Sequence, residues 1–136
     1  MRRVAVALIS ALLFAQTDTA NALPLRQVSV CKLTWNTAEL IGQRVRVEGY
    51  VFDLSSHGIA LVSKRRQCSR VTSVALMGAK VYPLLYKAVA NSGGPRRVII
   101  VGTVAWHPAR LGGHNPGLVV EQVEHISTHD ADLKDF

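Results

Sequence analysis

Four basic side chains in one short segment are the strongest candidates for binding chemistry in this sequence. Lys64, Arg65, Arg66 and Arg70 lie within seven residues of one another. Guanidinium groups bind the oxygens of phosphate and sulfate through paired hydrogen bonds, so such a cluster can hold a polyanion. The same run can also be a solvated turn whose charge protects neighbouring strand edges. The sequence leaves both interpretations open.

Three further arginines extend the polyanion hypothesis. Arg96 and Arg97 begin an apolar run, and Arg110 lies in a segment rich in glycine, proline and histidine. The chain carries a net charge of +7, and a positive field attracts nucleic acids and acidic glycans. If these arginines share one groove with the cluster, the hypothesis gains support, and if they scatter it loses support. The alternative is a protein-interaction or envelope-accessory domain whose basicity is incidental.

Three histidines also fall in predicted loops, namely His57, His107 and His114. Three imidazoles and a water could hold zinc in a hydrolase, but the spacings match no ligand motif. Residues 53–56 carry an acid and two serines beside His57, yet a catalytic triad is assembled across a fold rather than within one short segment. We therefore predict a binding domain without catalytic residues, metal or other cofactor.

One helix pattern organises the elements that would position these residues. The spacing i, i+3, i+4, i+7, i+8 predicts a helix over Lys80–Asn91 with one apolar side facing the core. That side comprises Val81, Leu84, Leu85, Ala88 and Val89. A second, shorter helix is predicted over Thr34–Leu40.

Five apolar runs predict strands, three before the long helix and two after it. The clearest run alternates apolar and polar residues, with Gly49 at a point suited to a bend. In the fourth run Gly102 has the corresponding place, and the alternation predicts an inward Trp106 that closes one end of the core. Trp35 is expected to plug the opposite end. The five runs are Arg44–Asp53, Ile59–Ser63, Val71–Met77, Arg97–Trp106 and Gly117–Ile126.

The segment Leu40–Val51 resembles the opening of OB-fold domains, in which a glycine precedes a long first strand that carries its own glycine. The resemblance covers about Thr34–Ile126 and is nearest to small exported bacterial OB-domain proteins of unassigned activity. It implies a mainly β fold, a five-stranded Greek-key barrel with one α-helix between strands 3 and 4. It also implies a ligand face across strands 2 and 3, bordered by residues 53–57 and 107–115. Those two strands lack the aromatic residues that stack on nucleic acid bases.

The two ends of the chain carry their own signals. A basic start, an apolar run over Val4–Ala15 and small residues at positions 20 and 22 predict a secretory signal peptide over residues 1–22, cut after Ala22. We therefore expect a periplasmic or extracellular protein, in which Cys31 and Cys68 form a disulfide rather than free thiols or half of a metal site. Residues 23–33 are predicted to be an extended lead-in, residues 34–126 the OB-fold domain and residues 127–136 a frayed acidic tail.

Overall fold

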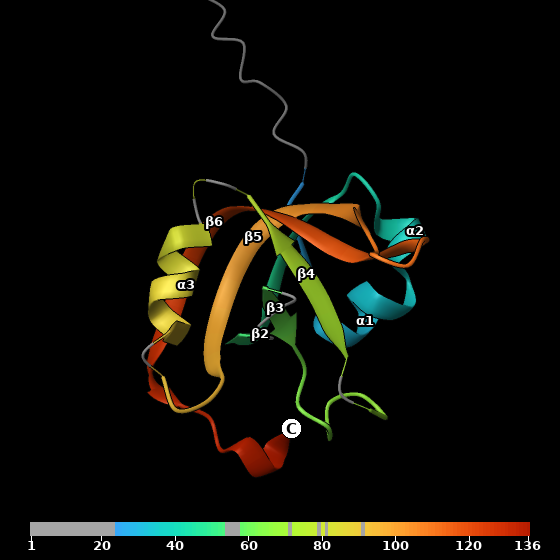
Figure 1. The fold of residues 1–136 in the computed structure, drawn as a ribbon. Coiled ribbons are helices and arrows are strands. Elements are labelled where there is room, and N and C mark those ends of the chain that lie inside the picture. The colour runs from blue at the N-terminus through green and yellow to red at the C-terminus, as the bar shows by residue number, and fades with distance from the viewer. Residues whose placement is uncertain (1–23, 54–57, 71, 79, 81, 91) are drawn as a thin grey trace, which may run out of the picture.

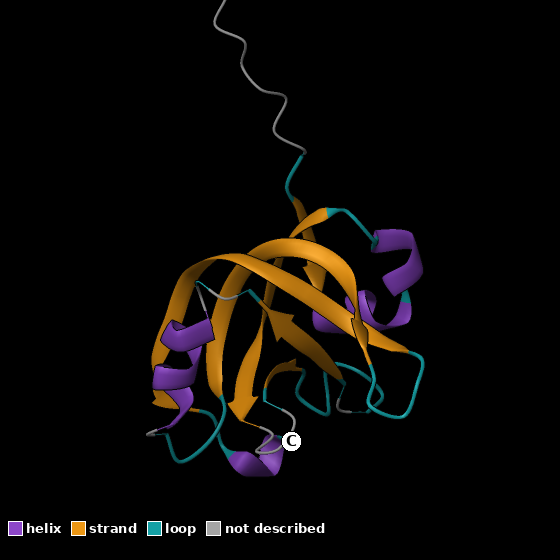
Figure 2. Cartoon of the chain, turned by 45° about the horizontal axis from the view of Figure 1, so that its top comes forward, coloured by secondary structure: helices purple, strands orange, loops and turns teal. Residues whose placement is uncertain are grey.

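Five strands close into a β-barrel in the computed structural model, which describes residues 24–53, 58–70, 72–78, 80, 82–90 and 92–136. The strands follow the order β2-β3-β4-β6-β5, and β5 pairs again with β2 to close the barrel (Figures 1 and 2). The β4–β6 pair is parallel and the other barrel pairs are antiparallel. This mainly β architecture confirms the predicted OB-like fold. The barrel strands are β2 (Arg44–Asp53), β3 (Ile59–Val62), β4 (Ser73–Met77), β5 (Arg96–Pro108) and β6 (His114–Asp130).

The first barrel strand, β2, shows why the sequence folds this way. Val45, Val47 and Val51 are fully buried, as the alternation predicts. Gly49 lies where β2 changes partner along one edge, from β1 (Arg26–Ser29) to β3. A side chain at this position would come within 2.8 Å of the Val30 side chain, so the glycine allows the N-terminal segment to pack closely against the barrel.

The strand β5 buries the predicted alternate residues up to Val104, but not Trp106. Pairing of β5 with β2 ends at Thr103, and beyond it β5 pairs only with β6 in a projecting hairpin. Trp106 lies on this hairpin and is 42% exposed, so the prediction that it closes the barrel is wrong.

The helix α3 (Tyr82–Ala90) lies between β4 and β5, where the sequence predicts it. Leu85 and Val89 join the core, whereas Leu84 is 53% exposed. Only a narrow side of this nine-residue helix faces the barrel, so the predicted apolar side is wider than the buried one. Val81 lies outside the described residues.

The N-terminal segment is more structured than predicted. After β1 come two short helices, α1 (Val30–Trp35) and α2 (Thr37–Leu40), in place of an extended lead-in and a single helix. Ser29 caps α1 because its hydroxyl accepts a hydrogen bond from the Lys32 N–H at 3.1 Å. Leu33 and Leu40 are among the buried residues of these helices, while Trp35 is 60% exposed, so the prediction that it plugs the barrel is wrong.

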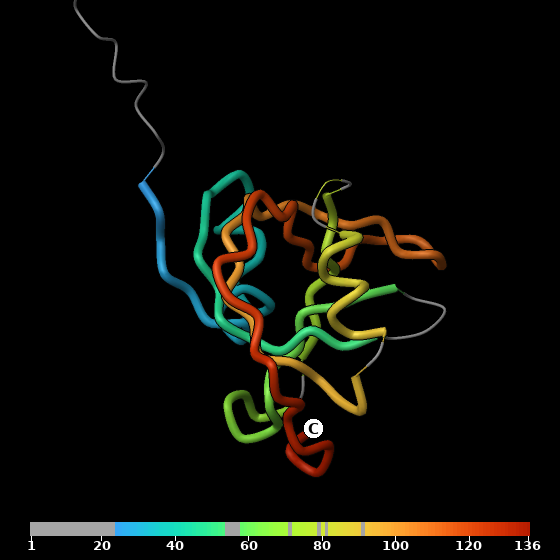
Figure 3. Tube along the Cα trace, turned by 90° about the vertical axis from the view of Figure 1, so that its left-hand side faces the viewer, coloured from blue at the N-terminus to red at the C-terminus, as the bar shows by residue number. Residues whose placement is uncertain are grey.

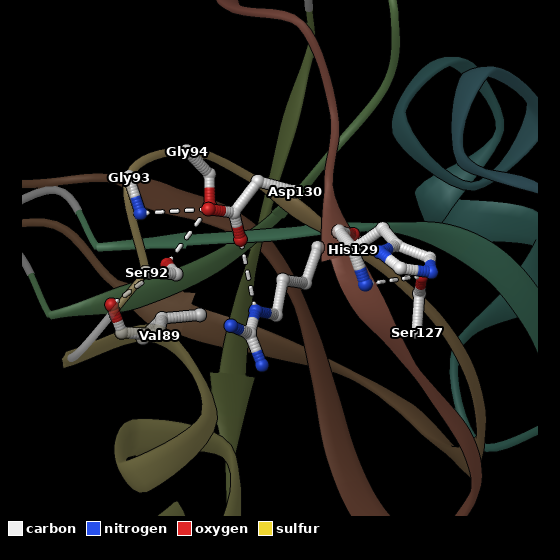
Figure 4. Close-up of polar contacts among 8 residues, drawn as sticks. Val89, Ser92, Gly93, Gly94, Ser127, His129 and Asp130 are labelled. Carbon is white, nitrogen blue, oxygen red and sulfur yellow. Dashed lines mark hydrogen bonds and ion pairs between the residues drawn. The ribbon is translucent and has the colours of Figure 1, made fainter.

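The C-terminal segment also differs from the prediction. The strand β6 runs to Asp130, and the 3-10 helix η2 (Leu133–Asp135) then packs back toward the barrel instead of fraying. Asp130 pairs with Arg96 at 2.9 Å and accepts a hydrogen bond from the Gly93 N–H at 2.8 Å (Figure 4). Two acidic residues of this segment thus meet groups from distant parts of the chain, Asp130 with Arg96 and Gly93 and Asp135 with Lys64.

A disulfide joins Cys31 to Cys68, as predicted from the isolated pair of cysteines. It connects α1 to the turn between β3 and β4. The predicted signal peptide, residues 1–22, lies outside the described residues. Within the described part of the chain, no helix is both long and apolar enough to cross a membrane.

Candidate polyanion-binding site

The basic turn, residues 64–70, connects β3 to β4 and is held at several points. Its Cys68 is bonded to Cys31 on α1. Within the turn, the Gln67 N–H donates to the Lys64 carbonyl at 3.0 Å, and the Lys64 N–H donates to the Gln67 side chain at 3.1 Å. The backbone that carries the basic side chains is therefore constrained before any ligand binds.

Three arginines of the basic turn present free charge to solvent. Arg65, Arg66 and Arg70 are all exposed. Among the described residues, no hydrogen bond or ion pair engages their guanidinium groups. Guanidinium groups in this state can bind oxyanions without first breaking an ion pair.

Lys64 differs from these arginines because it already has partners. Its ammonium lies 3.1 Å from the Asp135 carboxylate and 5.0 Å from the centre of the Tyr50 ring. The hydrogen bond to Asp135 raises the pKa of Lys64, and its contact with Tyr50 raises it further. Lys64 therefore stays protonated, with its charge partly neutralised by the C-terminal segment.

Arg96 and Arg97 lie at the same end of the barrel as the basic turn, but they are paired. Arg97 stands opposite Tyr50 in the β2–β5 register, and its guanidinium binds Glu48 at 2.6 Å. This pair raises the pKa of Arg97 and lowers that of Glu48. Arg96 is bound to Asp130, so neither arginine adds uncompensated charge to the basic turn.

Arg110 lies elsewhere, in the hairpin between β5 and β6 (orange in Figure 1). It lines a groove of about 730 Å³ that crosses the predicted OB ligand face. Thus Arg96 and Arg97 lie near the basic turn but are paired, and Arg110 borders a separate groove. Among the described residues, the three arginines therefore share no groove with the basic turn, and this arrangement counts against them as part of a polyanion site. The groove is formed by Ile59, Ala60, Ser73, Ala75, His107, Pro108, Ala109, Arg110, Leu111, Asn115 and Pro116.

The groove is mainly apolar in character. The strands β3 and β4 contribute small residues to it, and at the tip of the hairpin Leu111 is fully exposed. The prediction that His107 and His114 lie in a loop is wrong, because β5 extends to Pro108 and β6 begins at His114. His107 lines the groove, whereas His114 contacts Trp106, with ring centres 6.2 Å apart. His57 lies outside the described residues, and the part of the chain that is described holds no group of three metal-binding side chains.

Sequence reasoning missed the carboxylates that neutralise the outer face of the barrel. Glu121 binds Arg44 at 2.7 Å and Glu124 binds Arg46 at 2.6 Å, both across strands. It also missed the contact of Asp135 with Lys64. The available signal was the acidic character of the last seven residues, opposite in sign to the basic turn.

Comparison of the sequence with protein-family models and with curated proteins finds no match. The strand order and the disulfide define this protein as an OB-like barrel domain with a disulfide-anchored basic turn.

Proposed function

We propose that this chain is an exported, non-catalytic OB-like module that binds a polyanion, nucleic acid or acidic glycan, through Arg65, Arg66 and Arg70. The observation that carries the proposal is the contrast between two groups of arginines. The three in the basic turn are exposed and unpaired among the described residues, whereas Arg44, Arg46, Arg96 and Arg97 each bind a carboxylate.

The physical argument rests on the order of the basic turn before binding. The disulfide and the hydrogen bonds within the turn reduce the backbone freedom that binding would otherwise remove. Three phosphate or sulfate contacts of this kind give modest affinity, with Kd roughly 10⁻⁴–10⁻⁶ M at physiological salt. Binding of this type weakens steeply as salt rises, because counterions are released from the polyanion.

Export is supported by the disulfide, because such bonds persist in oxidising compartments. The basic and apolar character of residues 1–22 supports it independently. Expression in a host with a secretion system, followed by mass measurement of the product, tests this part of the proposal. A product that begins at residue 23 is expected, and an intact product retained in the cytoplasm would contradict export.

The binding proposal is tested by replacing Arg65, Arg66 and Arg70 with glutamine. We expect at least a tenfold loss of affinity for heparin and for a 20-nucleotide DNA, measured by fluorescence anisotropy at low salt. The two probes distinguish sulfate from phosphate ligands.

A second triple variant, in which Arg26, Arg44 and Arg46 are replaced with glutamine, is the matched control. It removes the same charge from residues that already have polar or acidic partners. We expect less than a threefold loss for this control. Equal losses in the two variants would show that only net charge matters, and absence of binding to both probes at low salt would refute the proposal.

The apolar groove favours a second candidate function, protein interaction at the β5–β6 hairpin. Its supporting observation is the fully exposed Leu111 beside a groove lined with small and apolar residues. Such binding would tolerate salt. It would be lost when residues 110–113 are deleted, while polyanion binding remained.

A further inference from the structure

The C-terminal residues contact the basic turn directly. The Asp135 carboxylate binds the Lys64 ammonium at 3.1 Å, and the Asp135 carbonyl accepts a hydrogen bond from the Arg65 N–H at 3.0 Å. The Phe136 ring meets the Tyr50 ring edge-on, with centres 5.3 Å apart. Tyr50 is also the ring that lies beneath Lys64. The last two residues therefore cover part of the proposed polyanion site.

Contacts at the end of β6 direct the C-terminal segment toward the basic turn. Asp130 is held by Arg96 and by Gly93, and the contact with Gly93 is labelled in Figure 4. The next residue, Ala131, donates its N–H to the Pro95 carbonyl at 2.7 Å. The helix η2 then turns back beside the basic turn, and Figure 3 shows the red C-terminal end next to the green loop.

The covering segment is only loosely packed. The side chains of Lys64 and Asp135 are 31% and 39% exposed, and ion pairs this open to solvent contribute little to stability. A cavity of about 270 Å³ lies beside the segment, lined by its Leu133 and Phe136 together with residues that include Phe52, Val62 and Pro95. A competing ligand could therefore displace the segment without disturbing the barrel.

We propose that residues 131–136 are an intramolecular competitor for the polyanion. The carboxylate of Asp135 occupies the place on Lys64 that a phosphate or sulfate would take. When the segment leaves, Lys64 joins the three arginines and Tyr50 becomes accessible, so the complete site has four cations and an aromatic ring. This inference rests on the proposed function and adds regulation of the same site.

Phe136→Ala is the decisive variant because it weakens the contact with Tyr50 without changing charge. If most molecules hold the segment in place, apparent affinity is reduced by the fraction of molecules that are open. We expect affinity for a heparin decasaccharide and for a dT20 oligonucleotide to rise about 3- to 10-fold in this variant by that relation. Asp135→Asn should also strengthen binding.

Glu39→Gln is the charge-matched control for Asp135→Asn. Glu39 lies on α2, at the opposite end of the molecule from the C-terminus in Figure 1. A rise in affinity for Asp135→Asn well above that for Glu39→Gln supports competition. Equal rises in affinity would show that the effect comes from net charge alone and would contradict the proposal.

Hydrogen exchange of the Arg65 N–H reports on the segment independently of ligand affinity. This amide should exchange faster in Phe136→Ala, and faster in the wild type when the decasaccharide is added, while amides of the barrel strands stay protected. If the wild type binds either probe and Phe136→Ala binds it equally, the competitor is refuted and the proposed function stands. If neither protein binds either probe although Arg65 exchange is faster in the variant, the proposed function itself is refuted.

Discussion

Gly49 and Gly102 occupy mid-strand positions where the barrel leaves little or no room for a side chain. At Gly49 the obstacles are the side chains of Val30 and Leu61. At Gly102 the obstacle is the carbonyl oxygen of Val119, which belongs to the paired strand and cannot move without disturbing the ladder. Flexible side chains yield more readily than backbone, so the two glycines differ in how much change they tolerate.

Gly102→Ala is therefore expected to lower the free energy of unfolding by about 3 kcal/mol, the upper part of the range for overpacked cores. Gly93→Ala is the control, since its new side chain would meet only the Asp130 carboxylate at an ordinary 3.4 Å. The control should change stability by less than about 0.5 kcal/mol. Urea unfolding followed by circular dichroism measures both variants, and equal stabilities would contradict the steric argument.

Among the elements, α1 depends on its covalent connection to the basic turn. The disulfide closes a segment of 37 residues that contains β2 and β3. Such a cross-link reduces the number of conformations open to the unfolded chain, and in a small domain the resulting stabilisation is a large share of the total stability.

Replacing both Cys31 and Cys68 with serine should lower the free energy of unfolding by about 2–4 kcal/mol. The wild type unfolded in the presence of a reductant provides the control, and it should lose a similar amount. A double variant as stable as the oxidised wild type would show that the disulfide constrains little.

The ion pairs between barrel strands give stability a dependence on pH. The hydrogen bond from Arg44, followed by that from Thr103, holds the pKa of Glu121 below its ordinary value of 4.5. The hydrogen bond from Arg97 lowers the pKa of Glu48 in the same way. A carboxyl group whose pKa is lower in the folded protein than in the unfolded chain stabilises the fold at pH values above the unfolded-chain pKa. This contribution is lost as the pH falls through the pKa of the folded protein.

We therefore expect stability to be nearly constant from pH 7 down to about 5 and to decrease below about pH 4.5, the ordinary value for glutamate. Glu121→Gln should show a smaller decrease, because glutamine does not titrate. The urea midpoint measured between pH 7 and pH 3 tests this expectation. Parallel pH profiles for the variant and the wild type would exclude a contribution from the Arg44–Glu121 pair.

For polyanion binding by the whole molecule, the positions of the charges matter more than the net charge. The net charge is +7, yet carboxylates neutralise the arginines on the outer face of β2 and at the start of β5. The free guanidinium groups of the basic turn remain at one end, next to the C-terminal segment. Polyanions should therefore approach this end rather than the barrel as a whole.

The salt dependence of DNA binding measures how many cations of the basic turn contact phosphates. For duplex DNA, affinity falls with salt by a slope of about 0.9 for each phosphate neutralised. We expect a log–log slope of about −4 for both the wild type and Phe136→Ala by the same rule, because the ligand displaces the segment and contacts Lys64 in both complexes. Glu39→Gln should keep the wild-type slope, and a slope of about −3 for the wild type would show that Lys64 stays on Asp135 and contradict its release.

Local patterns were sufficient to predict most of the fold. Alternation predicted β2, and helical spacing predicted α3, because these periods follow directly from backbone geometry. The patterns failed where pairing decides the outcome. Trp106 continues an inward alternation, yet it lies beyond the residue at which β5 leaves β2. The short strand β1 is a strand only because β2 lies beside it.

The sequence alone predicted the strands and the long helix from periodicity, and the disulfide and the basic cluster from residue type, while its resemblance to OB-fold domains predicted the barrel. Only the tertiary structure decided which cations remain free. Arg44 and Glu121 are 77 positions apart and meet through strand register, and Lys64 meets Asp135 at a separation of 71. Contacts between such distant residues depend on the closed barrel, and no local pattern encodes them.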